Sequence, residues 1–182
     1  MTDIFYRRNL PHWQPEHCSI FVTWRLHGSL PVGFAQHLRK WNSEPGKQFL
    51  NADRMLDAAS NGPLWLNDPE IAWHAQRAIE RGAALGHYAL RAYVIMPNHA
   101  HVLIDPLVPL AKLTLGIKRA SAQDANARLG RTGQPFWQDE SFDHWIRGPG
   151  EFSKIHAYIE NNPVKAHLCR KPEDWPWSSA HK

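Results

Sequence analysis

Cysteine is scarce in this sequence, with only two cysteines in 182 residues. Cys18 and Cys169 lie far apart and form no Cys-x-x-Cys pair. This excludes both the disulfide framework of a small secreted domain and the ligand spacing of a structural zinc site. Long hydrophobic runs are also missing, and no stretch has the length of a membrane span. We therefore expect a cytoplasmic protein with free thiols that does not associate with a membrane.

Repeats, low-complexity tracts and interdomain linkers are absent as well, and the length suits one domain with its own core. The hydrophobic content of 43% and the charged content of 21% exclude wholesale disorder. Lysine and arginine outnumber the acidic residues by 21 to 17, which favours an anionic partner such as nucleic acid. We expect a single domain over residues 1–182, with a basic N-terminal arm at 1–18 and a C-terminal tail at 170–182.

The order of hydrophobic patterns predicts an α+β fold. Alternating residues predict a first strand over 19–26, and two apolar runs around Pro97-Asn98 predict a β-hairpin over 88–105. Helical periodicity is present at 34–41, 47–59, 69–86, 109–129 and 151–161, and a last strand is expected within 136–147. Asp68 is expected to cap the helix that begins at Pro69. This order of elements matches a split βαβ arrangement with an antiparallel sheet of four to five strands.

The hairpin contains two histidines, His99 and His101, one residue apart. Side chains alternate along a strand, so both imidazoles point to the same face and can share a cation. Twelve histidines in 182 residues produce about one such pair by chance, so histidines without a metal remain an alternative. The pair follows a turn directly and begins an apolar strand, where packing gives no reason for two imidazoles.

The helix expected at 151–161 has an apolar stripe that must face the sheet, with Tyr158 at its edge. Asn162 lies one turn beyond Tyr158 if the helix continues. Pro163 disfavours helical geometry at Asn162, so geometry alone favours Asn162 as the cap of a second short helix. Gly148-Pro149-Gly150 precedes the helix, and we interpret it as a hinge.

Basic residues are densest on the exposed side of the helix expected at 109–129. They contact DNA phosphates or form a solvated face, and the pattern does not distinguish these two interpretations. The candidate DNA-binding residues are Arg7, Arg8, Lys112, Lys118, Arg119, Arg147, Lys154 and Lys165.

Several separated segments resemble the IS200-like tyrosine transposases. The segments are Val94–Ile104, Phe136–His144, Tyr158–Ala166 and the closing Pro176–Ser179. The opening segments Arg8–His12 and Phe21–Leu26 are similar to those of the REP-associated tyrosine transposases within this family. The resemblance covers nearly the whole chain, and its motifs occur in the family's order.

The family belongs to the HUH endonucleases, so the resemblance implies a ferredoxin-like antiparallel sheet with helices on one face and a C-terminal tyrosine-bearing helix. In these enzymes a histidine pair holds a divalent metal and a tyrosine attacks DNA, which implies metal ligands at His99 and His101 and a nucleophile at Tyr158. Insertion-sequence relatives complete the metal site with a glutamine four residues after the tyrosine, and this chain has the shorter Asn162 there. The implied partners are single-stranded DNA hairpins of repeated extragenic palindromes, bound by a monomer or a homodimer.

The residue types suit this chemistry. A phenol with a pKa of about 10 is a poor nucleophile at neutral pH and needs a cation to polarise the phosphate. Imidazole, amide and phosphate ligands suit Mg²⁺ or Mn²⁺. We expect a single-strand endonuclease and strand transferase with a 5′-phosphotyrosine intermediate. The alternatives are a hairpin-binding protein without catalysis, a small metallohydrolase that uses His99, His101 and Asp105, and an RNA-binding protein. The central strands of this chain lack the aromatic pattern that an RNA-binding sheet of this type carries.

Overall fold

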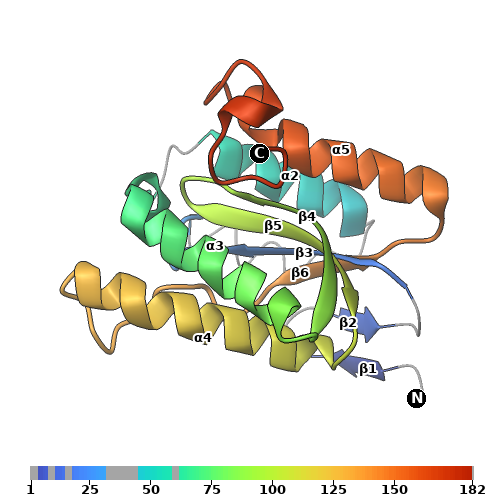
Figure 1. Cartoon of the computed structure of the whole chain (residues 1–182), viewed down its shortest axis with the longest axis horizontal. Helices are drawn as coiled ribbons and strands as arrows, with labels where there is room; N and C mark the ends of the chain where they lie inside the picture. The colour runs from blue at the N-terminus through green and yellow to red at the C-terminus, as the bar shows by residue number, and fades with distance from the viewer. Residues whose placement is uncertain (1–3, 8–10, 15–17, 32–44, 59–61, 182) are drawn as a thin grey trace.

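A computed structural model describes residues 4–7, 11–14, 18–31, 45–58 and 62–181 of the chain (Figure 1). Side chains are described for residues 18–31, 51–58 and 62–181. The helix expected at 34–41 lies outside the described residues, as does Arg8.

The described elements follow the predicted order of strands and helices. They are β1 Ile4–Arg7, β2 Pro11–Gln14, β3 Ile20–Arg25, α2 Pro45–Asp57, the 3₁₀ turn Trp65–Asn67, α3 Pro69–Ala84, β4 Tyr88–Ile95, β5 His99–Pro106, α4 Leu110–Arg128, β6 Phe142–Trp145, α5 Pro149–Lys165 and the 3₁₀ turn Pro172–Asp174. Within the described residues no helix is long and apolar enough to cross a membrane.

Four strands form one antiparallel sheet in the order β4-β5-β3-β6. The hairpin partners β4 and β5 are adjacent, and β5 lies between β4 and β3, as a split βαβ arrangement requires. The predicted α+β fold with a ferredoxin-like sheet is therefore confirmed. In the stretch expected as an arm, β1 and β2 pair with each other in a separate two-stranded sheet.

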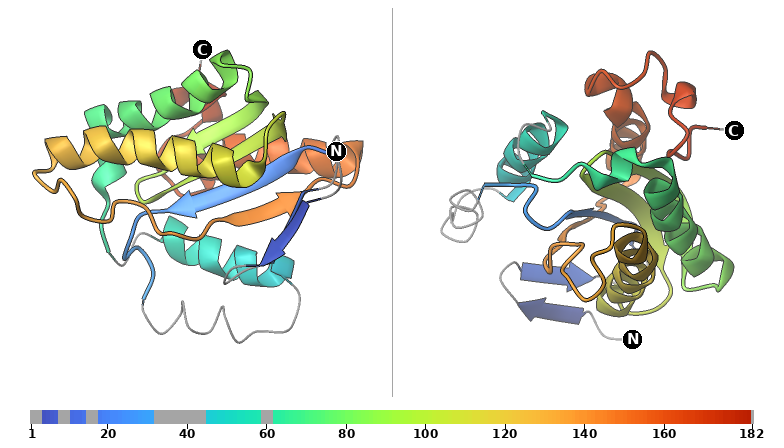
Figure 2. Two further views of the ribbon diagram at one scale, coloured as in Figure 1. Left: turned by 90° about the horizontal axis from the view of Figure 1, so that it is seen from below. Right: turned by 90° about the vertical axis from the view of Figure 1, so that its left-hand side faces the viewer.

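The helices form two layers around the four-stranded sheet. Figure 2 shows α3 and α4 on one side of the sheet and α2 and α5 on the other. The sheet therefore separates two faces with different partners, and alternation along β3 and β5 decides which side chain reaches which face.

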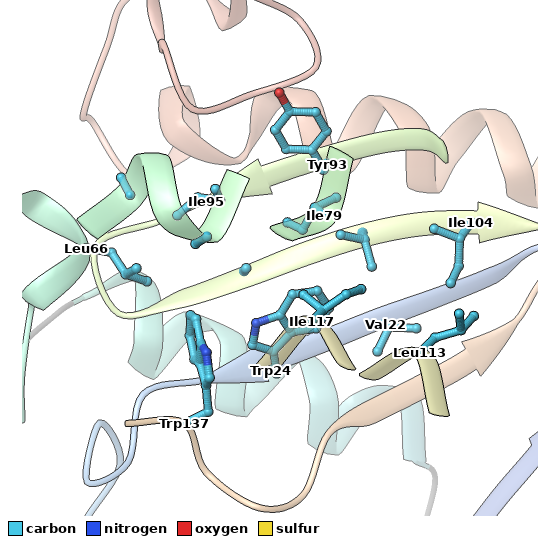
Figure 3. Packing of buried hydrophobic residues seen from close by; sticks show 14 of the residues in the cluster. Val22, Trp24, Leu66, Ile79, Tyr93, Ile95, Ile104, Leu113, Ile117 and Trp137 are labelled. Carbon is cyan, nitrogen blue, oxygen red and sulfur yellow. The ribbon is translucent and has the colours of Figure 1, made fainter. Parts of the chain in front are cut away.

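The larger core lies between the sheet and the pair α3 and α4. Val22 and Trp24 of β3 and Ile104 of β5 are at most 2% exposed and meet Ile79 of α3 and Ile117 of α4 (Figure 3). Nearly every described side chain on this face of β3 and β5 is apolar. This core therefore anchors the sheet without taking part in polar chemistry.

The opposite face has a smaller apolar cluster. It contains Phe21, Leu103, Ile146 and Ile159, with Phe152 and Ile155 packed against them. The predicted apolar stripe of the last helix thus faces the sheet, which is confirmed. His99 and His101 lie on this face with 0% exposure.

Helix α5 differs from the sequence expectation at its C-terminal end. It continues through Pro163 to Lys165, and Asn162 lies inside it, so the expectation that Asn162 caps a second helix is wrong. Pro163 removes one helical hydrogen bond, but the amide of Ala166 donates to the carbonyl of Asn162 and keeps the last turn intact. Burial of Ile159, Asn162 and Pro163 against the sheet accounts for the helical geometry.

The N-terminal ends of α3 and α5 fit their local sequences. The Asp68 side chain accepts a hydrogen bond from the Glu70 amide at 3.0 Å, and Pro69 begins the helix, so the predicted cap is confirmed. Gly148 is the N-cap residue of α5, and Pro149 and Gly150 belong to its first turn. The expected hinge therefore lies where the loop after β6 becomes helix.

The C-terminal tail lies along the outer edge of the sheet. The Ile95 amide donates to the carbonyl of Trp177, and the Ser179 amide donates to the carbonyl of Tyr93. The Trp175 indole also donates to the carbonyl of Ile95 at 2.9 Å. These bonds cover polar backbone groups of β4, which would otherwise be a free edge.

Two helical glycines provide a matched test of packing in this fold. A Cβ at Gly82 of α3 would lie 2.5 Å from the Tyr88 hydroxyl, and the buried Tyr88 ring is held by its hydrogen bond to the Ile79 carbonyl. A Cβ at Gly116 of α4 meets nothing within 4 Å. We expect Gly82→Ala to lower the free energy of unfolding by about 1–2 kcal/mol and Gly116→Ala to raise it by about 0.5–1 kcal/mol. Urea denaturation of both variants measures this, and equal effects would contradict the packing described.

Candidate metal and tyrosine site

The two histidines of β5 converge on one point. Their Nε2 atoms are 3.1 Å apart. The Nδ1 atom of His99 lies 2.7 Å from the Asn98 Oδ1, which is an acceptor, and the Nδ1 atom of His101 lies 2.7 Å from the Thr23 hydroxyl. Partners of this kind hold the ring orientation and leave Nε2 available to a ligand. Two ligands at right angles on a cation with bonds of about 2.2 Å would also lie about 3.1 Å apart.

Asp53 of α2 brings a carboxylate to the same point. Its Oδ1 lies 3.1 Å from the Nε2 of His101 and 3.8 Å from the Nε2 of His99. All three side chains have exposures of 1% or less. The three ligand atoms lie within 4.8 Å of one another. Among the described residues, these three side chains form a group that could hold a metal ion. Two imidazoles and one carboxylate fit a divalent cation.

The electrostatics of this group favour a neutral His99 imidazole and a charged Asp53 carboxylate. Burial, together with the charge of His101, lowers the pKa of His99 to about 3. Burial by itself would raise the pKa of Asp53, but His101, His99 and Tyr158 hold that pKa well below its usual range. Neutral imidazole and ionised carboxylate are the forms that bind metal ions.

A second carboxylate lies on the same face of α2, one helical turn later. Burial and the neighbouring charge of Asp53 raise the pKa of Asp57, while Lys165 opposes this rise. The Lys165 ammonium lies 2.7 Å from Asp57 Oδ2 and 3.5 Å from Asp53 Oδ2. Lys165 therefore connects the end of α5 to the acidic side of α2.

Tyr158 reaches the group from α5. Its hydroxyl donates to the Oδ2 of Asp53, the oxygen that does not face the histidines. Its ring packs edge-on against Phe21, with ring centroids 6.2 Å apart, and its centroid is 5.7 Å from that of His101. Burial, and then the charge of Asp53, raise the pKa of Tyr158 far above its ordinary value. The phenol is therefore neutral here.

Asn162 lies one turn after Tyr158 and is fully buried. Neither polar atom of its side-chain amide forms a well-aligned hydrogen bond with another described residue, and the same is true of Asp57 Oδ1. Buried polar atoms without partners are costly, and several of them around one cluster suit a site that takes up a polar ligand. The donor atoms present therefore fit a divalent cation at this point.

The predicted DNA-binding residues lie in different surroundings. Lys112, Arg119 and Lys154 are exposed, and the Arg147 guanidinium covers the Trp145 ring at 5.2 Å. Lys118 donates to the carbonyls of residues 138–140. The hydrogen-bonding capacity of Lys118 and Lys165 is thus largely used within the protein. Arg7 lies in β1, where side chains are not described.

The carboxylate considered for a metallohydrolase, Asp105, lies at the other end of β5. It accepts hydrogen bonds from the guanidinium of Arg91 and the hydroxyl of Ser19. It therefore cannot join His99 and His101, and Asp53 occupies the position for which Asp105 was considered.

Sequence reasoning placed residues 47–59 on a helix but did not single out Asp53. The available signal was the Asp53 and Asp57 pair, four residues apart on a segment whose apolar residues Leu56 and Met55 require a buried side. Acidic residues at helical spacing are common on solvated faces, so the pair was not distinctive. Its significance depends on α2 packing over β5.

Comparisons with known proteins show what this chain is similar to. The family model described as Transposase IS200 like matches residues 65–162, more than half of the chain. A Haemophilus influenzae protein described as a REP-associated tyrosine transposase is 26% identical over 110 residues, which is 53% of this chain and 62% of that protein. The match spans less than two thirds of that relative.

The fold also matches a solved structure of the REP-associated tyrosine transposase bound to a REP hairpin. The TM-score is 0.59 at 19% identity, over 97% of this chain and 82% of that chain. This likeness shows a shared fold. The family match contains His99, His101, Tyr158 and Asn162 but begins after α2, so Asp53 lies outside it.

The role of Asp53 in metal binding can be measured directly. We expect Asp53→Asn to weaken Mn²⁺ binding at least about 100-fold, because loss of even an outer partner of a metal ligand costs about 10–100-fold. Asp105→Asn is the control. It removes a carboxylate that lies at the far end of β5, where Asp105 pairs with Arg91, and it should leave the Mn²⁺ affinity unchanged. Isothermal titration calorimetry compares the two variants, and equal losses would exclude Asp53 as a ligand.

Proposed function

Because this chain belongs to the IS200-like transposase family, we propose that it is a metal-dependent endonuclease and strand transferase that acts on single-stranded DNA hairpins through Tyr158. Membership makes it an enzyme of the transposase kind. The hairpin substrate is proposed from its similarity to REP-associated transposases, one of which was solved with a REP hairpin.

One observation carries the proposal. The Tyr158 hydroxyl donates to one oxygen of Asp53, while the other oxygen lies 3.1 Å from the Nε2 of His101. A nucleophile on α5 and a histidine on β5 are thus joined through a single carboxylate on α2. This arrangement supports a role for the phenol beside a cation and its bound phosphate.

Tyr158 is the group that attacks. Its phenolic oxygen forms a bond to the phosphorus as the bond from phosphorus to the 3′-oxygen breaks, which leaves a 5′-phosphotyrosine and a free 3′-OH. Asp53 Oδ2 already accepts the phenol's hydrogen bond and is placed to receive the proton. The leaving 3′-oxygen takes up a proton in turn.

His99, His101 and Asp53 would hold the cation, and the buried amide of Asn162, one turn after Tyr158 on α5, would contribute its oxygen or contact the bound phosphate. When bound, a divalent metal supplies charge that polarises the scissile phosphate. Mg²⁺ prefers oxygen ligands, whereas Mn²⁺ also accepts imidazole, so this donor set suits Mn²⁺ somewhat better than Mg²⁺.

The covalent intermediate explains how cleavage and rejoining can share one site. The phosphotyrosine bond retains the energy of the phosphodiester, so a 3′-OH from another strand can reseal it without ATP. The reaction requires the tyrosine to stay buried from water between the two steps. Tyr158 is partly buried against Phe21 and is flanked by Lys165, whose ammonium lies 5.3 Å from the ring centroid.

Replacement of the proposed nucleophile is the decisive experiment. We expect Tyr158→Phe to abolish the covalent protein–DNA adduct on a denaturing gel, because the attacking oxygen is gone, while hairpin binding stays within a few-fold. Tyr93→Phe is the matched control. Tyr93 is a buried tyrosine whose phenol contacts Gln76 and Glu80, away from the histidines.

The same gel separates the alternatives. Cleavage that persists in Tyr158→Phe without any protein-linked product would support a metallohydrolase using His99, His101 and Asp53. Hairpin binding without cleavage in the unmodified protein, at saturating Mn²⁺, would support a binding protein that has lost catalysis.

The hinge before α5 is a further prediction. We propose that α5 moves between cleavage and strand transfer. Gly148 and Gly150 have open space where a Cβ would be, so alanine fits there. We expect Gly148→Ala with Gly150→Ala to preserve adduct formation and to slow strand transfer, because alanine restricts the backbone. Gly116→Ala on α4 is the control. Unchanged strand transfer would argue against a hinge at this place.

A further inference from the structure

Arg25 lies on the same face of the sheet as the two histidines. Phe21 and Thr23 of β3 point to this face, since Phe21 packs near Tyr158 and Thr23 contacts His101, and Arg25 continues the alternation. In the sheet register Arg25 is paired with His99. Directly opposed residues of an antiparallel pair have neighbouring side chains. The side chain of Arg25 therefore extends from the strand position next to His99 in the candidate metal site.

The guanidinium has weak partners within the described residues. One nitrogen, Nη1, donates to the Leu26 carbonyl at 3.5 Å and to the Ser29 hydroxyl at 3.4 Å. Both distances are at the limit for a hydrogen bond, and neither partner carries charge. Burial lowers the pKa of Arg25 to about 10. Most of its five N–H donors therefore have no protein acceptor in the described structure.

Several other described arginines of this chain do have strong partners. Arg91 pairs with Asp105, and Arg128 pairs with Asp68. Arg131, which is also half buried, covers the Trp65 ring at 4.4 Å. Arg25 has neither a carboxylate nor an aromatic ring among its described contacts. A half-buried charge without such a partner is costly, so an external anion would stabilise it.

We propose that Arg25 binds a backbone phosphate of the DNA strand that enters the His99 and His101 site. This proposal rests on the function proposed above. A guanidinium offers a planar fork that matches two phosphate oxygens, and such charge-assisted hydrogen bonds are among the strongest that proteins make. The carboxylates of this face already face other groups, because Asp53 meets the histidines and Asp57 meets Lys165. The charge of Arg25 thus remains available to a phosphate.

The contact also gives Arg25 a positioning role. Arg25 and His99 are cross-strand neighbours at the tip of the hairpin, where the Leu26 amide donates to the Asn98 carbonyl at 2.8 Å. A phosphate held there, next to the one that Tyr158 attacks, would fix the register of the strand. Loss of the contact should therefore weaken binding of the DNA hairpin. It should also allow cleavage at neighbouring phosphodiester bonds.

The test uses single-stranded hairpin oligonucleotides in which one phosphate at a time is replaced by an uncharged methylphosphonate. Equilibrium affinities are measured with Mn²⁺ in the Tyr158→Phe background, so that no covalent adduct forms. Arg25→Gln removes the charge and keeps a polar amide, Arg25→Lys keeps the charge, and Arg81→Gln is the control. Arg81 is exposed on α3, across the sheet, and its replacement changes the net charge equally.

Arg25→Gln should weaken binding of the unmodified hairpin at least about tenfold relative to Arg81→Gln. At one position along the strand, the methylphosphonate should weaken binding by the protein with Arg25 by a similar factor. The same methylphosphonate should leave the affinity of Arg25→Gln almost unchanged. Arg25→Lys should recover part of the affinity. Unchanged Mn²⁺ affinity and urea stability in Arg25→Gln would show that the site itself is intact.

Two outcomes would overturn the proposal. One is an affinity of Arg25→Gln within about twofold of Arg81→Gln, and the other is a methylphosphonate profile identical to that of the Arg25 protein at every position. Failure of the proposed function is a different result. In that case the protein with Tyr158 intact forms no covalent adduct, while the phosphate profile still identifies the contact of Arg25.

Discussion

The candidate site depends on the interactions that the Asp53 carboxylate makes with its neighbours. One of its oxygens faces the histidines of β5, and the other accepts the hydrogen bond of Tyr158. Asp53 and the two histidines are buried and Tyr158 is partly buried, and a buried charge is stable only when its neighbours satisfy it. The group therefore has to be treated as one unit, because removing any member leaves the others without their partners.

The two faces of the sheet divide stability from chemistry. Between the sheet and α3 and α4 the packing is almost entirely apolar, and this core holds β5 in the middle of the sheet. The opposite face has fewer apolar contacts and includes several polar atoms that have no hydrogen-bond partner within the described part of the chain. A rigid strand that presents ligands on its second face is well suited to hold a metal, because its first face already determines the backbone position.

Much of the fold was predictable from local patterns. Alternation predicted the hairpin at 88–105, the Asp68-Pro69 signal predicted the start of α3, and the apolar stripe of α5 correctly faced the sheet. The end of α5 was predicted wrongly, because Pro163 is a strong local signal against a helix and the stabilising burial of Asn162 depends on distant residues. Local propensity is a weak guide where tertiary packing opposes it.

For the candidate site, the sequence alone was sufficient to select His99, His101 and Tyr158 as candidates, because their spacing within recognisable motifs does not depend on how the elements pack. The sequence alone did not identify Asp53 as a candidate. It lies 46 positions before His99 on a helix with no motif, and its proximity to His101 results from the placement of α2 on the same side of the sheet as α5. Strand alternation dictates which way a side chain points, but the distance between two elements is decided by the burial of their apolar faces against a common sheet.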